Sequence, residues 1–309
     1  MVYTDVPAQV SVLPEGRFMM PEHSSVFLAW ARRQIQIPTT CTPLSIRWVG
    51  NGQRFFQVQG TRSVVDDNSY LLLNSGQESA SEIDSPWSVR CYTVCFRPGM
   101  VEDVLRALVT PEDRLLDEPE RTDQQPVNFV EKVYPHHDGI STVLARLTAC
   151  TSHNLSDSNP SYAWFEEQFH ELLVQMLAVH RNVRREIESL PGVRATTRLE
   201  LYRRLHRARE FMDASLEQPL TIAEIAQVAW FSPYHFLRLF KQAFGETPHQ
   251  YLIRRRLDRA QSLLIHSDMP VTEICYAIGF ESLGSFSGLF HRQIGQTPMQ
   301  FRRETRNRS

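Results

Sequence analysis

The stretch LFKQAFGETPHQYL, from Leu239 to Leu252, occurs again as LFHRQIGQTPMQF from Leu289 to Phe301, 50 residues later. A Leu-Phe pair, a Gly, a Thr-Pro pair and an aromatic residue recur: Leu239-Phe240 and Leu289-Phe290, Gly245 and Gly295, Thr247-Pro248 and Thr297-Pro298, and Tyr251 and Phe301. Gly can adopt the left-handed conformation that closes a helix, and Thr followed by Pro caps the next helix. Each copy therefore predicts a helix, a stop and a second helix.

A short helix is predicted before each copy. Thr221 and Glu224 have the spacing of a capping box, and Ser232-Pro233 repeats the combination of cap and proline. Two short helices joined by a tight turn, with exposed polar and aromatic side chains on the second, are typical of a helix-turn-helix motif. The predicted helices cover about residues 222–229 and 233–244 in the first copy and 271–278 and 282–294 in the second, with turns at Trp230-Phe231 and Gly279-Phe280.

The segment between the copies, PHQYLIRRRLDRAQSLLIHS, predicts one long helix. Its apolar residues recur at helical spacing at Ile253, Leu257, Ala260 and Leu264. About 18 residues at 1.5 Å each give a helix of ~27 Å, comparable with the ~34 Å between successive turns of the DNA major groove. A spacer of this length would place two recognition helices in neighbouring grooves.

Length and charge distribution favour two domains with different partners. The chain has 309 residues, of which 42% are hydrophobic and 22% charged, enough for about two globular domains. The net charge is only −2, but residues 191–309 hold 17 Lys and Arg against 11 Asp and Glu, whereas residues 1–190 hold 16 against 24. The repeat thus lies in a basic half, which favours a nucleic-acid contact there.

No apolar run approaches the roughly 20 residues of a membrane helix, and the N-terminus lacks a basic end followed by an apolar core. We therefore expect a cytoplasmic protein that does not contact the membrane.

Residues Pro219 to Arg303 resemble the double helix-turn-helix DNA-binding domain of the AraC/XylS family of bacterial transcription regulators. The segments that carry the resemblance are IAQVAWFSPYHFLRLFKQAFGETPHQYL, RRRLDRAQSLL and ICYAIGFESLGSFSGLFHRQIGQTPMQFRR. In that family the domain usually follows a sensor or dimerisation domain, and the earlier part of this chain resembles the family's cupin-like sensor more loosely. The resemblance implies double-stranded DNA and RNA polymerase as partners, with a homodimer as a further option.

The resemblance also implies which residues read bases. In the first recognition helix they are Pro233, Tyr234, Leu237 and Arg238, and Arg238 is the strongest candidate because a guanidinium can bind guanine O6 and N7 together. The second recognition helix would present Leu283, Gly284, Ser285 and Gly288. Phosphate contacts are expected from Ser232, His235, Arg254, Arg255 and Arg256, although the three arginines could equally form a solvated face.

Two positions depart from the family pattern. The family often has Arg where this chain has Gly288, so the second helix is short of long polar side chains and low in helix propensity. We therefore expect the first motif to do most of the base reading. The family usually has a turn Gly where this chain has Trp230; because a Trp with positive φ is strained, that turn is expected to be built differently.

The first half predicts a small barrel followed by helices, which makes the whole chain α+β. Short β-rich runs cover residues 44–50, 53–60, 62–67, 69–74 and 87–96, and helical patterns cover 99–109, 139–150 and 162–190. The last helix has an apolar stripe, from Phe165 to Leu177, that suits packing on the barrel or a dimer contact. The expected division is an effector-binding or dimerisation domain over residues 1–190, a linker over 191–200 and a DNA-binding domain over 201–309.

An apolar pocket for a small effector is predicted inside the barrel, with Trp48, Trp87, Arg90 and Tyr92 as candidates. The two Trp residues could equally be plain core. Strand alternation places Trp48 on one face and Arg47 on the other, in solvent. If Arg90 faces inward, an anionic effector is favoured.

No catalytic, metal or cofactor site is expected. No His lies between Cys41 and Pro135, where a metal-binding cupin would need a His-x-His pair, and the five cysteines contain no Cys-x-x-Cys. The sequence thus predicts a transcription regulator, with activation and repression both open. The alternatives are a constitutive or partner-controlled regulator whose barrel only dimerises and, last, an enzyme tethered to DNA.

Overall fold

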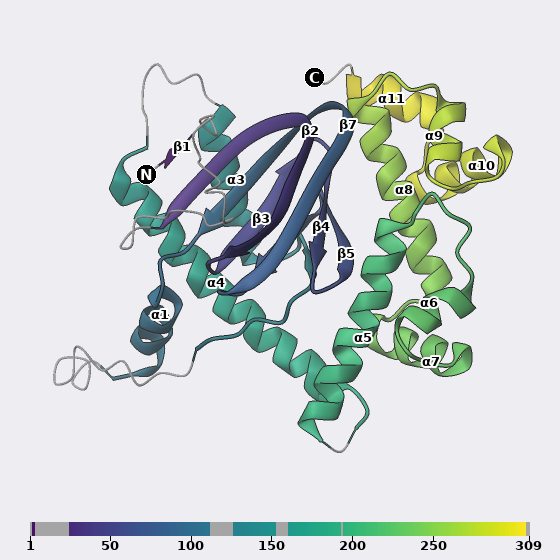
Figure 1. The fold of residues 1–309 in the computed structure, drawn as a ribbon. Coiled ribbons are helices and arrows are strands. Elements are labelled where there is room, and N and C mark those ends of the chain that lie inside the picture. The colour runs from purple at the N-terminus through teal and green to yellow at the C-terminus, as the bar shows by residue number, and fades with distance from the viewer. Residues whose placement is uncertain (1, 4–24, 112–125, 153–159, 193, 307–309) are drawn as a thin grey trace.

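The computed structural model describes residues 2–3, 25–111, 126–152, 160–192 and 194–306, and these form a β-barrel with helices followed by an all-helical part (Figure 1). The strands are β1 (Val2–Tyr3), β2 (Val26–Thr42), β3 (Ser45–Gly50), β4 (Gln53–Val58), β5 (Thr61–Asp66), β6 (Ser69–Leu73), β7 (Gln77–Cys95) and β8 (Val133–Pro135). The helices are α1 (Met100–Val109), α3 (Gly139–Ser152), α4 (Tyr162–Ser189), α5 (Ala195–Ala214), α6 (Ile222–Val228), α7 (Pro233–Phe244), α8 (Pro248–His266), α9 (Val271–Ala277), α10 (Leu283–Ile294) and α11 (Pro298–Arg306). The predicted α+β class is confirmed.

Two long strands organise the barrel. β2 and β7 pair antiparallel along most of their length, and the second half of β7 also pairs with β3 whereas its first half pairs with β4. β7 therefore joins two halves of the sheet, β3-β6-β8 and β4-β5, into a nearly closed barrel. The pairing of β2 with β7 shifts register twice, and Pro38 and Pro86 lie at these two irregularities, as expected for a residue that cannot donate to the ladder.

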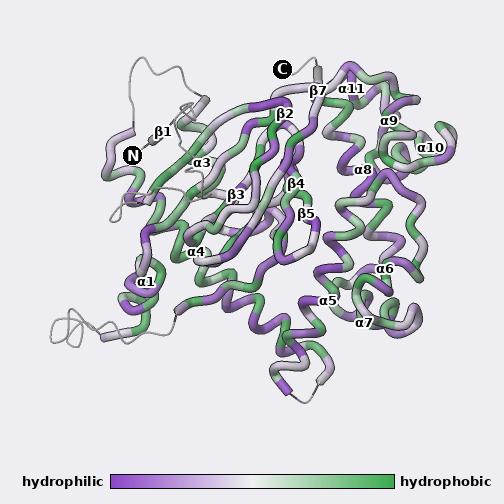
Figure 2. Tube along the Cα trace, in the orientation of Figure 1, coloured by the Kyte–Doolittle hydropathy of each residue, from purple (hydrophilic) through white to green (hydrophobic). Residues whose placement is uncertain are grey.

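Helices cover the outer face of the sheet, and hydrophobic residues are frequent where the strands and the first part of α4 meet (Figures 1 and 2). Trp48, Phe27 and Tyr92 all stack against one another on this face, and the indole of Trp48 donates to Thr148 of α3 at 2.9 Å. The predicted stripe of α4 packs on the same core: Phe165, Phe169, Leu172, Leu173 and Met176 are all buried in it. Packing on the chain's own barrel is thus confirmed for α4.

The other face of the sheet lines the barrel interior and is partly polar. Its apolar side chains include Phe56, Val65 and Val89, but Arg47 and Arg54 are also buried there, with 7% and 3% of their surface exposed. The expectation that Arg47 lies in solvent was wrong. The reason is that both faces of β3 are covered, one by helices and one by the opposite wall of the barrel.

The helical part places one helix-turn-helix motif at each end of α8 (Figure 1). The repeat has a packing reason. In the first motif Phe236, Phe240 and Tyr251 form consecutive edge-to-face contacts, and in the second Phe286, Phe290 and Phe301 do the same, each pair with ring centroids 5.4–5.9 Å apart. Each motif therefore buries its own aromatic stack against the helix that follows its Thr-Pro cap.

The barrel docks directly onto the helical part. Ser63 of β5 donates to Glu210 of α5 at 2.8 Å, and Arg255 of α8 forms an ion pair with Asp66 at 2.8 Å. The predicted linker over 191–200 is shorter in the structure because α5 begins at Ala195. Within the described ranges, no helix combines the length and apolar character needed to cross a bilayer.

Candidate nucleic-acid interface

The first helix-turn-helix motif is fixed at its ends by the predicted caps. The backbone N–H of Glu224 donates to the hydroxyl of Thr221 at 3.2 Å, while the Glu224 carboxylate accepts from the backbone N–H of Thr221 at 2.8 Å. The Thr221 hydroxyl also donates to this carboxylate at 2.7 Å, and this bond, together with that from the Thr221 backbone N–H, lowers the pKa of Glu224. At the other end, Gly245 closes α7 with φ 74° and donates to the carbonyl of Lys241. Both the capping box and the left-handed Gly are confirmed.

Helix α7 has one buried and one exposed face. Phe236 and Phe240 are fully buried, whereas Tyr234 has 80% and Leu237 39% of its surface exposed. Arg238 is exposed next to them, and within the described part of the chain it has no ion pair or side-chain hydrogen bond. The predicted base-reading residues therefore lie together on the face of α7 that points away from the core, with Pro233 exposed at the start of the same helix.

Two predicted phosphate contacts lie at the start of α7. Ser232 is the exposed N-cap, but its side chain makes no capping hydrogen bond, in contrast to Thr221. His235 is half-buried, with its ring packed edge-on against Phe231 at 5.4 Å. Both residues therefore border the exposed face that carries Tyr234 and Arg238.

The second motif has the same backbone arrangement as the first, but the predicted reading positions of its second helix, α10, carry smaller and uncharged side chains. Leu283, Gly284, Ser285 and Gly288 are all exposed on α10, as predicted. The backbone N–H of Ser285 donates to the Ser282 hydroxyl at 3.2 Å, so this helix has a side-chain cap. The basic side chains of α10, His291 and Arg292, occur only in its last turn. The four predicted base-reading residues of α10 therefore present a single hydroxyl group, that of Ser285, and no charged group.

The two turns share one backbone conformation, which contradicts the expectation for Trp230. Trp230 has φ 56° and Gly279 has φ 80°, and the next residue in each motif, Phe231 or Phe280, donates to a carbonyl five residues earlier. Trp230 thus adopts the strained left-handed conformation with its side chain 74% exposed. The two turns differ in the space that they leave for a side chain. The Trp230 side chain is exposed, whereas a Cβ on Gly279 would lie 2.5 Å from the carbonyl oxygen of Leu216.

The three consecutive arginines of α8 have different surroundings. Arg254 is exposed and pairs with Glu246 at 2.8 Å. Arg255 and Arg256 are buried at 9% exposure: Arg255 donates to Asp213 and Asp66, and Arg256 donates to the carbonyls of Leu216 and Gln218. Because these partners occupy both guanidinium groups inside the protein, this arrangement leaves only Arg254 exposed toward a phosphate.

The predicted effector residues do not form one site. Trp48 and Tyr92 are buried on the helix-covered face of the sheet, outside the barrel interior. Trp87 packs against the core of the second helix-turn-helix motif and donates to the carbonyl of Asn51, while Arg90 is exposed. Sequence reasoning missed Arg54, which faces the interior with Phe56 two residues later on the same strand.

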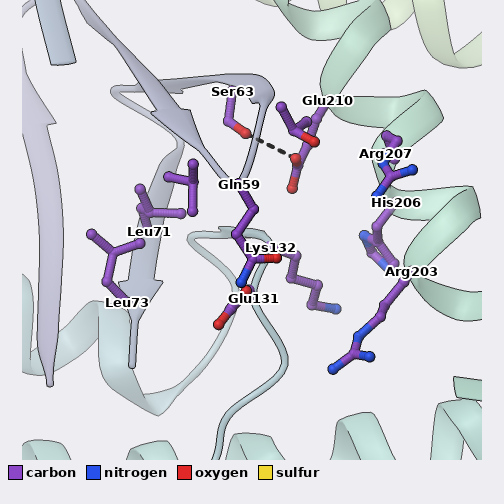
Figure 3. Close-up of a pocket in the computed structure, with 12 residues that line it drawn as sticks. Gln59, Ser63, Leu71, Leu73, Glu131, Lys132, Arg203, His206, Arg207 and Glu210 are labelled. Atoms are coloured by element: carbon purple, nitrogen blue, oxygen red, sulfur yellow. Dashed lines mark hydrogen bonds between the residues drawn. The ribbon is translucent and has the colours of Figure 1, made fainter. Parts of the chain in front are cut away.

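A small hollow marks the junction between the barrel and α5, and Figure 3 shows Arg203, His206, Arg207 and Glu210 of α5 opposite barrel residues and Lys132. Burial raises the pKa of Glu210 to about 7 despite hydrogen bonds from Ser63 and the backbone of Val133. Burial also lowers the pKa of Lys132 to about 8. Leu71 and Leu73 of the barrel's apolar interior line this hollow, so the interior borders directly on α5.

Across the described segments, no three His, Cys, Asp or Glu side chains are grouped as a metal site would require. The five cysteines are free thiols, and Cys91 and Cys95 are buried on β7.

Residues 225–304 match the family model described as Helix-turn-helix domain. The chain is 35% identical over 91 residues to the probable transcriptional regulator LumQ of Photobacterium leiognathi, a match that covers 29% of this chain and 37% of that protein. It is 46% identical over 65 residues to the HTH-type transcriptional activator RhaS of Shigella boydii, covering 21% of this chain and 23% of that protein. These matches span well under half of each curated relative.

Among solved structures, the DNA-binding domain of AdpA, a global transcriptional factor in complex with a target DNA, is 33% identical. That similarity covers 34% of this chain and 94% of the other, with a TM-score of 0.33.

Proposed function

We propose that the chain is a DNA-binding transcription regulator of the AraC/XylS type whose first motif reads the base sequence; the match of residues 225–304 to a helix-turn-helix domain supports this proposal. The observation that carries this proposal is the exposed face of α7, where Tyr234, Leu237 and Arg238 project from a helix fixed by buried phenylalanines. A rigid helix with an unpaired Arg suits bidentate binding to guanine in the major groove. Regulators of this family act without catalysis, and none is assigned to this chain.

The second motif would bind the neighbouring groove mainly through backbone and shape. The α8 helix has 19 residues, which at 1.5 Å each gives about 28 Å between the motifs, close to one turn of DNA. Leu283 and Ser285 offer small contacts to bases, and Ser232, His235 and Arg254 would hold the domain on phosphates.

An effector in the barrel would act on α5 and α8, because these two helices contact β5 and the β5-β6 turn. The hydrogen bonds between these elements include Ser63 to Glu210, Arg255 to Asp66 and Ser262 to Asp67. A ligand that moved β5 would change how the barrel holds the DNA-binding domain, which is the coupling that such a regulator needs. A cytoplasmic location, RNA polymerase as a partner and a homodimer on DNA belong to the same proposal.

The test is selection of binding sites from fragmented genomic DNA with the full chain, followed by footprinting of the best site. For Arg238→Ala we expect specific affinity to fall by about 1–3 kcal/mol, roughly 5- to 150-fold, and preference at one base pair to relax. Arg254→Ala should weaken binding to all sequences alike, and Arg33→Ala, an exposed Arg on β2, should change nothing. An unchanged sequence preference in Arg238→Ala would contradict base reading by α7.

A further inference from the structure

The barrel interior contains two buried arginines that both lie close to one aromatic ring, that of Phe56. Arg47 on β3 and Arg54 on β4 are both buried, and their guanidinium carbons lie 5.7 and 4.7 Å from the centre of the Phe56 ring. Strand alternation supports the placement, because Arg54, Phe56 and Val58 share one face of β4, and Phe56 and Val58 belong to the interior apolar cluster.

Few groups of the protein bind these guanidiniums. Arg54 donates to the Ser81 hydroxyl at 2.7 Å, and Arg47 donates to the Ser79 hydroxyl at 3.3 Å. The Nε atoms of both arginines are buried without a hydrogen-bond partner, although each guanidinium carries five N–H donors. Three further interior atoms on the same side of the barrel share this condition: Thr42 Oγ1, Ser45 Oγ and Gln77 Nε2.

No carboxylate neutralises the pair within the described residues. The fully buried polar side chains of that part of the chain include no Asp and no Glu. Burial raises the pKa of the Cys91 and Cys95 thiols, on the same face of β7, to about 11, so both are neutral near pH 7. Burial and the neighbouring Arg54 lower the pKa of Arg47 to about 10, which leaves it charged.

Arg255, another buried Arg of this chain, differs from Arg47 and Arg54 because carboxylates neutralise its charge. Its guanidinium lies between Asp66 and Asp213, each at 2.8 Å, and these carboxylates raise its pKa well above the ordinary value. Buried charges are costly unless they are paired in this way. Two positive charges in the barrel without such partners therefore require a different counter-charge.

The part of the interior next to Arg54 is not completely closed, because the neighbouring Trp30 is only partly buried. The ring of Trp30 lies 4.9 Å from the Arg54 guanidinium and adds a second aromatic surface.

We propose that the barrel interior binds a small organic carboxylate, whose oxygens accept hydrogen bonds from Arg47 and Arg54 and whose apolar part packs on Phe56 and Trp30. A planar guanidinium matches a carboxylate through two parallel hydrogen bonds, and the aromatic lining favours an apolar body over a strongly hydrated phosphate. That this ligand is the effector rests on the proposed function; binding itself does not. The interior also borders on α5, so the occupied barrel would be able to signal to the DNA-binding domain.

Thermal unfolding of the full chain tests binding directly. Benzoate, hexanoate and succinate are the carboxylate probes, benzamide is the neutral counterpart of benzoate, and inorganic phosphate is the competing anion. We expect at least one carboxylate to raise Tm by roughly 5–10 °C near 100 times its Kd, with no shift from benzamide. No shift from any of the three carboxylates, an equal shift from benzamide, or a shift from phosphate alone would overturn the proposal.

Two variants connect the effect to the site. Arg54→Met should abolish the carboxylate shift and raise the Tm of the unliganded chain, because it removes an uncompensated buried charge. Arg62→Gln is the matched control and should keep the shift, because Arg62 is an exposed Arg that pairs with Glu82 of β7 and lies over Phe55, on the face of β4 opposite Arg54. A retained shift in Arg54→Met would overturn the assignment, and a lower unliganded Tm would point to a structural role instead.

If Arg54→Met fails to fold, Arg47→Lys gives the same test, since Lys keeps the charge but loses the paired hydrogen bonds and should weaken carboxylate binding at least tenfold. DNA binding is measured separately by footprinting without carboxylate. If the chain binds DNA specifically but no carboxylate raises its Tm, only the carboxylate site is contradicted. If a carboxylate raises the Tm but DNA binding is not specific, only the regulator function is contradicted.

Discussion

The two helix-turn-helix motifs have nearly the same backbone, but they differ in their surfaces and in how freely each turn can be altered. α7 exposes Tyr234, Leu237 and Arg238, whereas the corresponding surface of α10 exposes Leu283, two glycines and Ser285. The turn of the first motif tolerates a Trp at positive φ, while that of the second is packed against Leu216 and Arg256. The shared shape of the two motifs therefore comes from their buried aromatic residues, while the exposed residues differ from one motif to the other.

The largest effect is expected at the packed turn. In Gly279→Ala, the new Cβ would require a positive φ and would lie 2.5 Å from the Leu216 carbonyl oxygen and 2.7 Å from Arg256. Strain of this kind costs about 1–3 kcal/mol, and the contact with a backbone oxygen places the loss near the upper end. Urea unfolding of the full chain measures it through the shift of the transition midpoint.

Gly245→Ala is the matched control for this prediction. Gly245 also has positive φ, but its Cβ would meet no atom within 4 Å, so only the backbone strain remains. A Gly279→Ala variant no less stable than Gly245→Ala would mean that the contacts of Arg256 with the loop before α6 are not a constraint on the second motif.

A smaller effect of opposite sign is expected at the open turn. Trp230 adopts φ 56° with its side chain largely in solvent, so Trp230→Gly should relieve about 1 kcal/mol of backbone strain and lose little packing. We expect a higher urea midpoint. Trp230→Ala, which keeps the strain, should stay near the parent chain.

The DNA footprint of Trp230→Gly gives this prediction a second readout. Trp230 follows α6 and precedes the exposed N-cap of α7, so the turn that it forms sets where the proposed reading helix begins. If strain is retained for function, the variant should be more stable and bind its site more weakly. A destabilised Trp230→Gly would show that the indole packs more than its 74% exposure indicates.

The helices of the two motifs and the long helix between them could be predicted from the sequence to within one or two residues, because caps, left-handed glycines and helical periodicity all agree there, whereas α5 was not predicted. Thr221, Glu224, Gly245 and Gly295 have the roles that the sequence predicts for them. Trp230 is the exception, since the backbone hydrogen bonds of the turn outweigh the preference of a single side chain. The burial of Arg255 and Arg256 was also not foreseeable, because their carboxylate and carbonyl partners come from α5, the α5-α6 loop and the barrel.

The barrel was predicted only in part. Neither β2 nor the first half of β7 was predicted, although β2 and β7 form the longest pairing of the fold. Pro38 and Pro86 interrupt both segments, and on β7 the inward positions before Pro86 include Gln77, Ser79 and Ser81. A polar interior removes the usual alternation of apolar inside and polar outside. For the same reason the burial of Arg47 and Arg54 could not be predicted: in the sequence they resemble solvent-facing residues, and only the opposite wall of the barrel buries them.

The smallest effect is expected from placing an Arg at Gly288, the position in the second motif that corresponds to Arg238 in the first. Gly288 lies exposed on α10 with open space around it, so Gly288→Arg adds a cation to the helix surface without a clash and gains about 0.5–1 kcal/mol of helix propensity. If the added guanidinium contacts a phosphate, the salt dependence of DNA affinity should steepen by about one unit in log Kd against log salt concentration. Gly288→Gln supplies the propensity without the charge and is the matched control. A new base preference in Gly288→Arg, rather than a uniform gain on all sequences, would mean that α10 already enters the groove as deeply as α7, and that its smooth surface, not its position, keeps the second motif from reading sequence.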